Sequence, residues 1–301
     1  MTEGATRCGF VALVGAPNAG KSTLLNALVG SKVSIVSPKV QTTRSLVRGI
    51  ALKDQSQIIF VDTPGIFAPK RRLDRAMVTA ALTGAGDADL IALLVDAKKG
   101  LDGETRAIVE KLKELRQPKV LILNKIDLVK REALLALAQE ANALVPFERT
   151  FMISATKNDG VPDLLAYFAE AMPKGPWHYP ADEITDIPLR QMAAEITREK
   201  LYLKLHEELP YQSTVETDSW KELRDGSVRI EQTIFVERES QRKIVLGEGG
   251  RMIKSISMEA RREIAQAIER KVHLFLHVKV REGWENDPER YRAQNLEFPK
   301  E

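Results

Sequence analysis

The chain has a single cysteine, Cys8, and no apolar run long enough to span a bilayer. One cysteine cannot form an intramolecular disulfide or a cysteine-based zinc cluster. The apolar runs are short, and 90–95 is typical, whereas a membrane helix needs about 20 such residues. Residues 1–7 lack the basic-then-apolar order of a signal peptide. We therefore expect a cytoplasmic protein.

Net charge is also low, at +3 over 301 residues. This small excess excludes attraction of nucleic acid over the whole surface, so any such site must be local. The length suggests two domains, each large enough for its own core. No pattern of an oligomer interface stands out, and we expect a monomer.

A glycine-rich loop near the N-terminus matches the phosphate-binding pattern G-x-x-x-x-G-K-[ST]. It follows an apolar run, 8–14, and precedes a helical pattern that begins at Thr23. Its glycines let successive backbone N–H groups surround an anion, and the helix N-terminus adds positive potential. Lys21 would reach the terminal phosphates, and the Ser22 hydroxyl would bind Mg2+. The loop is Gly15-Ala16-Pro17-Asn18-Ala19-Gly20-Lys21-Ser22.

Strand and helix patterns alternate through the first half of the chain. Near-continuous apolar strands followed by helices predict a mostly parallel sheet covered on both faces, an α/β domain over residues 1–172. The expected strands are 45–51 and 57–61 as a hairpin, then 90–95, 119–123 and 150–154, and the expected helices are 73–85, 104–115, 131–144 and 161–172.

Three polar motifs follow strand ends, where open α/β sheets bind ligands. In Asp62-Thr63-Pro64-Gly65, the carboxylate can hold Mg2+ through water and the Gly65 N–H can approach a γ-phosphate. In Asn124-Lys125-Ile126-Asp127, the Asp127 carboxylate can accept hydrogen bonds from guanine N1–H and N2–H2, which adenine lacks. Asn124 can tie this motif to the phosphate loop, and the Lys125 stem can cover the base. In Ser154-Ala155-Thr156, the Ala155 N–H could bond guanine O6.

Together with Thr42-Thr43-Arg44, these motifs resemble the five signatures of translation-factor-class GTPases, in the branch of bacterial ribosome-associated enzymes. The resemblance implies a GTP- and GDP-binding switch with Ser22 and Thr43 as direct Mg2+ ligands and Asp62 behind them. Thr43 aligns better than Thr42, and Lys21, Thr43 and Gly65 would act on the γ-phosphate. The implied nucleotide contacts are Gly15, Ala16, Pro17, Asn18, Ala19, Gly20, Lys21, Ser22, Thr42, Thr43, Asp62, Thr63, Pro64, Gly65, Ile66, Asn124, Lys125, Asp127, Ser154, Ala155 and Thr156.

Ile66 stands where related enzymes carry the glutamine that orients water. An isoleucine cannot hydrogen-bond water, so we expect slow intrinsic hydrolysis that needs another group or a partner. Asn18 is associated in this branch with a K+ ion near the β/γ bridge, and we hypothesise the same ion here.

The rhythm changes after three prolines and a glycine in 173–180, which predict a linker over 173–184. Residues 185–285 then read as a helix (186–209), two strands (211–217 and 227–236), a helix, the glycine turn Gly247–Gly250, a helix, and a strand (271–280). That order resembles an α+β, type II KH domain. We expect a C-terminal tail at 286–301, with a short helix near 287–292.

Gly247-Glu248-Gly249-Gly250 matches the GXXG loop that clamps the backbone of single-stranded RNA in KH domains. Nine basic and five acidic residues in 238–271 concentrate positive charge around it. The alternative is an ordinary helix cap on a solvated, charged face. The expected RNA contacts are Arg242, Lys243, Ile244, Gly247, Glu248, Gly249, Gly250, Arg251 and Lys254.

A GTPase domain followed by a KH domain resembles the Era family over nearly the whole chain. The resemblance implies binding to the 3′ end of 16S ribosomal RNA, a role in maturation of the small ribosomal subunit, and a peripheral tie to the inner membrane. The alternative is an RNA chaperone or structural assembly protein that binds nucleotide without depending on hydrolysis. A tRNA-modifying GTPase is a third reading, but no segment could carry that chemistry.

Overall fold

The computed structural model describes residues 6–39, 42–67, 69, 72–207, 209–284, 287–293 and 296–299. Contacts between Cα atoms divide the chain into two compact units. The first contains residues 1–34, 43–186 and 289–301, and the second contains 35–42 and 187–288. The two units are therefore not simply consecutive in sequence. Residues 35–42 belong to the second unit, and residues 289–301 belong to the first. Among the described residues, no helix is both long and apolar enough to cross a bilayer.

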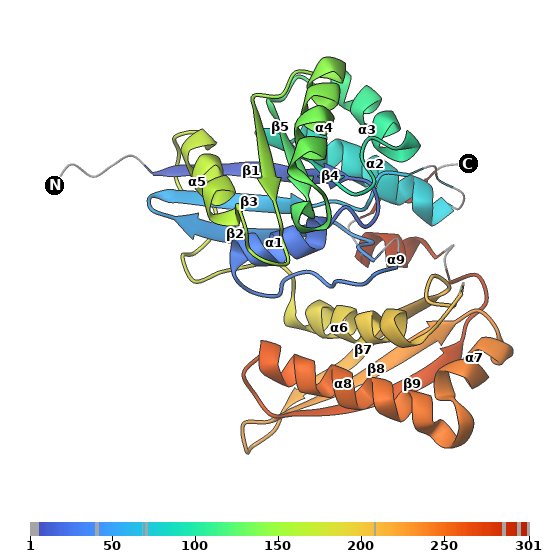
Figure 1. Ribbon diagram of the computed structural model, residues 1–301. Helices are drawn as coiled ribbons and strands as arrows, with labels where there is room; N and C mark the ends of the chain where they lie inside the picture. The colour runs from blue at the N-terminus through green and yellow to red at the C-terminus, as the bar shows by residue number, and fades with distance from the viewer. Residues whose placement is uncertain are drawn as a thin grey trace. The chain divides into compact units, whose positions relative to one another are not determined.

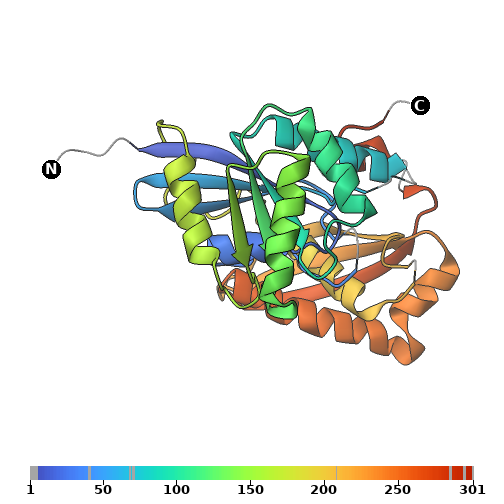
Figure 2. The same cartoon turned by 45° about the horizontal axis from the view of Figure 1, so that its top comes forward.

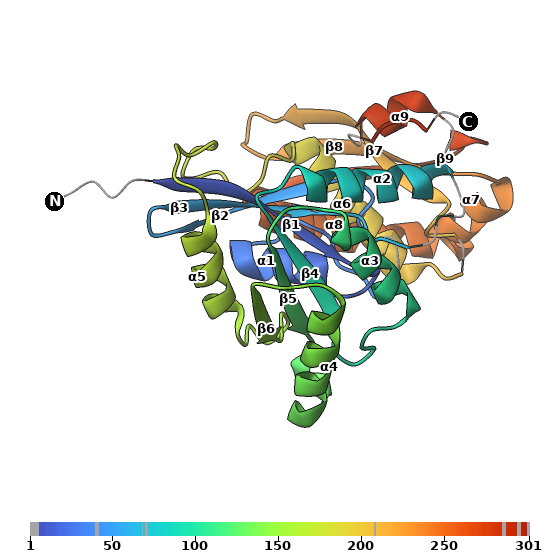
Figure 3. The same ribbon diagram turned by 90° about the horizontal axis from the view of Figure 1, so that it is seen from above.

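The first unit is built on a six-stranded sheet in the order β2-β3-β1-β4-β5-β6 (Figure 3). All neighbouring strands are parallel except β2 and β3, which form the predicted hairpin. This arrangement confirms the mostly parallel α/β domain. The strands are β1 (Arg7–Gly15), β2 (Val47–Lys53), β3 (Ser56–Asp62), β4 (Leu90–Asp96), β5 (Lys119–Asn124) and β6 (Arg149–Ile153).

Helices cover both faces of this sheet. On one face, Ala12 and Val14 of β1 join a core cluster with residues of α2, α3 and α4, while α1 and α5 lie side by side against the β2–β3 part of the sheet (Figures 1 and 3). Burial on both faces explains the near-continuous apolar strands. The helices are α1 (Lys21–Val29), α2 (Arg72–Gly86), α3 (Gly103–Lys113), α4 (Arg131–Leu144) and α5 (Val161–Ala171), with a 3-10 turn, η1 (Ile126–Leu128).

The stretch predicted as a linker, 173–184, is attached to the first unit. The Cys8 N–H donates to Pro173 O at 3.0 Å, and the Ile50 N–H donates to Ile184 O at 2.9 Å. The Gln57 side-chain oxygen accepts from the N–H groups of His178 and Tyr179 at 2.9 and 3.0 Å. Backbone donors of the edge strand β2, and of the first part of β1 that β4 does not reach, thus find partners in this stretch.

The helix predicted from Asp186 to Leu209 is shorter and begins later, as α6 (Leu189–Lys204). Asp186 does not cap it, because its carboxylate pairs with Arg48 at 2.7 Å. Pro188 occupies the N-cap position with φ −57°. An internal proline would remove a helical hydrogen bond, so the helix starts after it.

The second unit contains a three-stranded sheet in the order β7-β8-β9, antiparallel between β7 and β8 and parallel between β8 and β9. Helices α6 and α8 pack together on this sheet, as the yellow and orange helices show (Figures 1 and 2). The order of elements confirms the predicted KH domain. The elements are α6, β7 (Ser213–Glu222), β8 (Val228–Val236), α7 (Glu239–Leu246), a 3-10 turn, η2 (Glu248–Gly250), α8 (Arg251–Ala267) and β9 (Val272–Val280).

A short helix, α9 (Pro288–Ala293), lies near the end of the chain as the sequence predicts. The tail packs on α2 of the first unit through a cluster that includes Tyr291, Leu296, Leu73 and Met77. The Phe298 ring lies edge-on to Tyr291, with 4.9 Å between centroids. The helix that follows the Asp62–Gly65 motif therefore has part of its apolar face covered by residues more than 200 positions away.

We expect Tyr291→Ala to destabilise the first unit by about 3 kcal/mol, because a fully buried aromatic ring is lost from a packed cluster. Denaturant unfolding of the full chain measures the effect. Glu297→Ala is the matched control, since this tail side chain is exposed and should change stability by less than about 0.5 kcal/mol. Equal unfolding midpoints for the two variants would show that the tail cluster does not stabilise the unit.

Candidate functional site

The glycine-rich loop joins β1 to α1 and has the shape of an anion cradle. Gly20 has φ 102°, and a Cβ there would lie 2.2 Å from Asn124 Nδ2, so no other residue fits. Lys21 is buried, and its ammonium donates to the carbonyl oxygens of Gly15 and Ala16 at 3.1 and 3.2 Å. Burial lowers the pKa of Lys21 to about 8, against an opposing contribution from Asp62. A bound phosphate would supply a negative counter-charge next to the Lys21 ammonium and would favour its charged form.

Side-chain oxygens of Ser22, Thr43 and Asp62 converge beside the loop. Ser22 Oγ lies 2.9 Å from Thr43 Oγ1 and donates to Asp62 Oδ2 at 2.6 Å. Thr43 Oγ1 lies 3.3 Å from the same carboxylate oxygen. Asp62 Oδ1 is buried and has no hydrogen-bond partner among the described residues. Burial raises the pKa of Asp62. A hard divalent cation held by hydroxyl and carboxylate oxygens fits this donor set.

The two threonines of the Thr42-Thr43 pair point to different places. Thr43 is buried beside Ser22 and Asp62. The Thr42 hydroxyl instead donates to Lys39 O at 2.8 Å and lies in the second unit. Only the Thr43 hydroxyl is placed to bind a cation together with Ser22.

The Asn124–Asp127 motif is tied to the phosphate loop. The Asn124 amide donates to Ala19 O at 2.9 Å, which is the contact that the sequence predicts. Lys125 donates to Asn18 O at 2.7 Å and pairs with Asp96 at 2.6 Å. Sequence reasoning missed Asp96, although it ends β4 at the same edge of the sheet as the other motifs.

The proposed base contacts have distinct environments. A hydrogen bond from Ser154 lowers the pKa of Asp127, whose carboxylate also lies 3.5 Å from Lys157 Nζ. An ionised carboxylate accepts from N–H donors, as guanine recognition requires. The Ala155 N–H donates to Asn124 Oδ1 at 3.1 Å, so in this structure it braces the motif. Its contact with guanine O6 stays a prediction.

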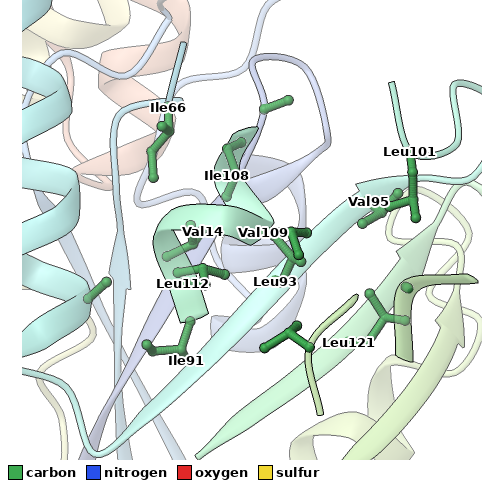
Figure 4. Close-up of a cluster of buried hydrophobic side chains, with 14 of the residues drawn as sticks. Val14, Ile66, Ile91, Leu93, Val95, Leu101, Ile108, Val109, Leu112 and Leu121 are labelled. Atoms are coloured by element: carbon green, nitrogen blue, oxygen red, sulfur yellow. The ribbon is translucent and has the colours of Figure 1, made fainter. Parts of the chain in front are cut away.

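The Ile66 side chain lies in the hydrophobic core, in a cluster that also contains Ala16 of the phosphate loop. The side chain is buried in this cluster, which is shared by β1, β4 and α3 (Figure 4). The Ile66 backbone N–H donates to Gly15 O at 3.3 Å, which holds the neighbouring Gly65 against the loop. Packing in the core accounts for an apolar residue at this position.

We expect Ile66→Gln to leave GTP turnover unchanged and to destabilise the first unit by about 1–3 kcal/mol, because the amide would enter an apolar core without partners. Single-turnover hydrolysis and denaturant unfolding measure the two effects. Ile66→Val, which keeps the core apolar, is the control. A tenfold faster hydrolysis in the glutamine variant would contradict a core-facing side chain.

The predicted RNA loop lies between α7 and α8 of the second unit. Gly247, Gly249 and Gly250 have φ of 72°, 59° and 77°, a region that favours glycine. A Cβ at Gly247 would lie 2.7 Å from Met252 Cβ. The four-residue turn therefore brings bare backbone to the surface, as the sequence predicts.

The predicted RNA contacts around this loop differ in how exposed they are. Lys243, Ile244, Arg251 and Lys254 are exposed, and Arg251 pairs with Glu248 at 3.1 Å. Arg242 is committed to the fold, because it donates to Val278 O at 3.2 Å and pairs with Glu239 at 2.8 Å. We therefore expect Arg242 to shape the site rather than hold a phosphate.

A cavity of about 290 Å³ next to α8 was missed by sequence reasoning. Met258 and Phe275 in its lining are exposed apolar side chains, at 55% and 44%. Exposed apolar positions flanked by Arg229 on β8 and Arg261 on α8 are the signal that could have identified it. The lining residues are Lys254, Ser257, Met258, Arg261, His273, Leu274 and Phe275.

Comparison with known proteins matches both units to family models. Residues 10–125 match the family described as 50S ribosome-binding GTPase, and residues 208–285 match the KH domain family. These spans contain the phosphate loop, Asp62, Asn124 and the glycine turn of the second unit.

Close relatives cover nearly the full chain. The GTPase Era of Bradyrhizobium sp. (strain ORS 278) is 67% identical over 299 residues, which cover 99% of this chain and 97% of the relative. The GTPase Era of Mesorhizobium japonicum is 65% identical, covering 98% and 95%. Two solved Era structures are 38% identical with a TM-score of 0.91, covering 95% of this chain and 98% of theirs. One is an Aquifex aeolicus variant bound to GDP·AlF4−, and the other is a complex with MgGDPNP and nucleotides 1506–1542 of 16S ribosomal RNA. The chain belongs to the Era family of GTPases.

Proposed function

We propose that this GTPase is a switch whose nucleotide state controls binding to the 3′ end of 16S ribosomal RNA, and that it assists assembly of the small ribosomal subunit. The observation that carries the proposal is the pairing of two sites in one chain. Ser22, Thr43 and Asp62 converge beside the phosphate loop, and a second glycine turn exposes backbone between α7 and α8. The Era complex with MgGDPNP and a 16S fragment supports the same pairing of ligands.

In the nucleotide site, different groups would bind the phosphates and the metal ion. Loop N–H groups and Lys21 would hold the phosphates of GTP or GDP, and Ser22 and Thr43 would hold Mg2+ with Asp62 behind them. When bound there, Mg2+ would neutralise negative charge on the phosphates. The Gly65 N–H would donate to the γ-phosphate, which places the Pro64–Gly65 peptide next to the reacting group. Loss of that phosphate would release Thr43 and Gly65 together.

The Ile66 side chain has no group that could orient water, so the intrinsic rate of GTP hydrolysis should be low. We propose that a K+ ion near Asn18 contributes charge during hydrolysis. Rates measured in K+ and in Na+ test this directly, and equal rates would remove the ion from the mechanism.

The second candidate function is an RNA chaperone or structural assembly protein in which nucleotide is bound but hydrolysis is not central. The core-facing Ile66 favours it. This second model predicts the same RNA affinity with GTP and with GDP, whereas the switch model predicts an RNA affinity that depends on the bound nucleotide.

The deciding experiment measures GTP hydrolysis with and without an RNA of nucleotides 1506–1542 of 16S ribosomal RNA. Acceleration by RNA supports the switch. Lys21→Ala should abolish hydrolysis in both conditions, and Gly247→Asp with Gly250→Asp should remove only the acceleration. Hydrolysis that is indifferent to RNA in the wild type would favour the structural alternative.

We further propose a cytoplasmic location with peripheral contact at the inner membrane, supported by resemblance to the family. Cell fractionation with and without high salt tests it, and recovery of the protein only in the soluble fraction would contradict the membrane contact.

A further inference from the structure

The segment that precedes Thr43 is part of the second unit. Residues 35–42 lie between α1 and β2 in sequence, yet they group with 187–288. Thr43 itself groups with the first unit and contacts Ser22 and Asp62. The peptide bond between Thr42 and Thr43 therefore connects the metal-binding threonine directly to the unit that carries the RNA loop.

Helix α6 holds this segment at three points. The Glu199 carboxylate accepts from the Val36 N–H at 2.8 Å. Lys39 donates to Tyr202 O, and Arg198 Nη2 donates to Thr42 O at 2.6 Å. Two of the three contacts are to the backbone of the segment, so they require a particular main-chain path rather than particular side chains.

The residues that make these contacts are unusual for a helix surface. The Arg198 side chain is only 2% exposed, and Glu199 is also buried. Arg198 is held by Glu195 and lies 5.2 Å from the centroid of the Tyr202 ring. Arginine is rarely buried to this extent unless it is paired. Its Nη1 atom has no hydrogen-bond partner among the described residues. The hydrogen bonds to Glu195 and Thr42 O therefore offset only part of the cost of removing the guanidinium from water.

We propose that Arg198 is a positioning residue for Thr43, and that the Arg198–Thr42 contact couples the nucleotide site to the RNA-binding unit. The contact fixes the Thr42 carbonyl, and the planar peptide bond transmits this constraint to the Thr43 backbone. In this structure the contact exists together with the convergence of Thr43, Ser22 and Asp62. A nucleotide that binds through Thr43 would favour the held segment, and the held segment would favour that nucleotide, since coupling is reciprocal.

The inference rests on the proposed function, and its test separates the two. The measured quantity is the ratio of RNA dissociation constants in GDP and in GDPNP, with the 1506–1542 RNA as probe. We expect a wild-type ratio of about tenfold, in the usual range for coupled sites. Arg198→Met keeps the bulk of the side chain and removes the hydrogen bond, and it should bring the ratio close to one. Arg198→Lys, which can still donate to Thr42 O, should retain part of it.

Hydrogen exchange of residues 35–43 gives a readout that does not depend on activity, and Arg198→Met should speed it. Arg190→Gln is the matched control, because this arginine also lies on α6 and donates to a backbone carbonyl, Asp218 O, at 3.0 Å, but makes no hydrogen bond to the described residues of the segment, 35–39 and 42. It should keep the wild-type ratio. If Arg198→Met does not fold, Val36→Pro is the second variant. It removes the hydrogen bond from the Val36 N–H to Glu199 and should also lower the ratio.

A wild-type ratio retained by Arg198→Met would overturn the inference and leave the proposed function standing. Loss of RNA binding by Arg198→Met in both nucleotide states would also overturn it, because Arg198 would then only support the fold of the second unit. A wild-type ratio of one would overturn the proposed switch itself.

Discussion

Asp127→Asn is expected to change the preferred nucleotide from GTP to XTP. The asparagine amide would face the N2 donor of guanine with a donor of its own, whereas xanthine presents a carbonyl oxygen there. Sites built to hydrogen-bond a group reject analogues lacking it by roughly 10⁴-fold, and we expect a swing of that order in the ratio of affinities. Equilibrium titration with fluorescent GTP and XTP measures it.

Asp159→Asn is the matched control, because this exposed carboxylate follows the neighbouring strand β6 and has no assigned base contact. It should leave the preference unchanged. An Asp127→Asn variant that still prefers GTP as strongly as the wild type would show that Asp127 does not contact the base.

Lys21→Met is expected to weaken GTP binding by roughly 2–5 kcal/mol, or about 30- to several thousand-fold, because it removes one partner of a buried charge pair with phosphate. The methionine keeps the apolar stem. Lys99→Met, on an exposed turn after β4, is the control and should bind normally. Titration calorimetry measures both, and equal affinities would contradict the placement of Lys21 at the phosphates.

The same calorimetry has a pH signature. Burial lowers the pKa of Lys21 to about 8 without nucleotide, so the free protein loses this proton above pH 8. Phosphate oxygens favour the charged form and would raise that pKa. GTP binding at pH 9 should therefore take up close to one proton, and affinity should be lower at pH 9 than at pH 7. Lys21→Met should lose this proton uptake while keeping any dependence that comes from guanine itself.

The convergence of the residues in the candidate nucleotide site was largely predictable from local sequence. Ser22, Asp62 and Asn124 each sit at a fixed offset from a strand or helix end, and parallel strands bring those ends to one edge of the sheet. Apolar runs and glycines locate these ends in sequence. The orientation of Ile66 was not predictable, because its inward direction depends on packing against α3 and β4.

The features that the sequence did not predict depend on contacts between residues far apart in the chain. Nothing in the sequence of α6 shows that Arg198 meets Thr42, 156 positions away. Periodicity also extended α6 too far toward Asp186, whose real partner is Arg48 on β2. The tail helix was expected, but its packing on α2 through Tyr291 was not. In each case tertiary contacts decide what local propensity leaves open.

The most direct test of the nucleotide-controlled switch is the affinity of the wild-type chain for the 1506–1542 RNA, measured with GDPNP and with GDP in Mg2+. The two glycine loops and the segment between them predict tighter RNA binding with GDPNP, by about tenfold. Identical affinities in the two nucleotides would contradict the account.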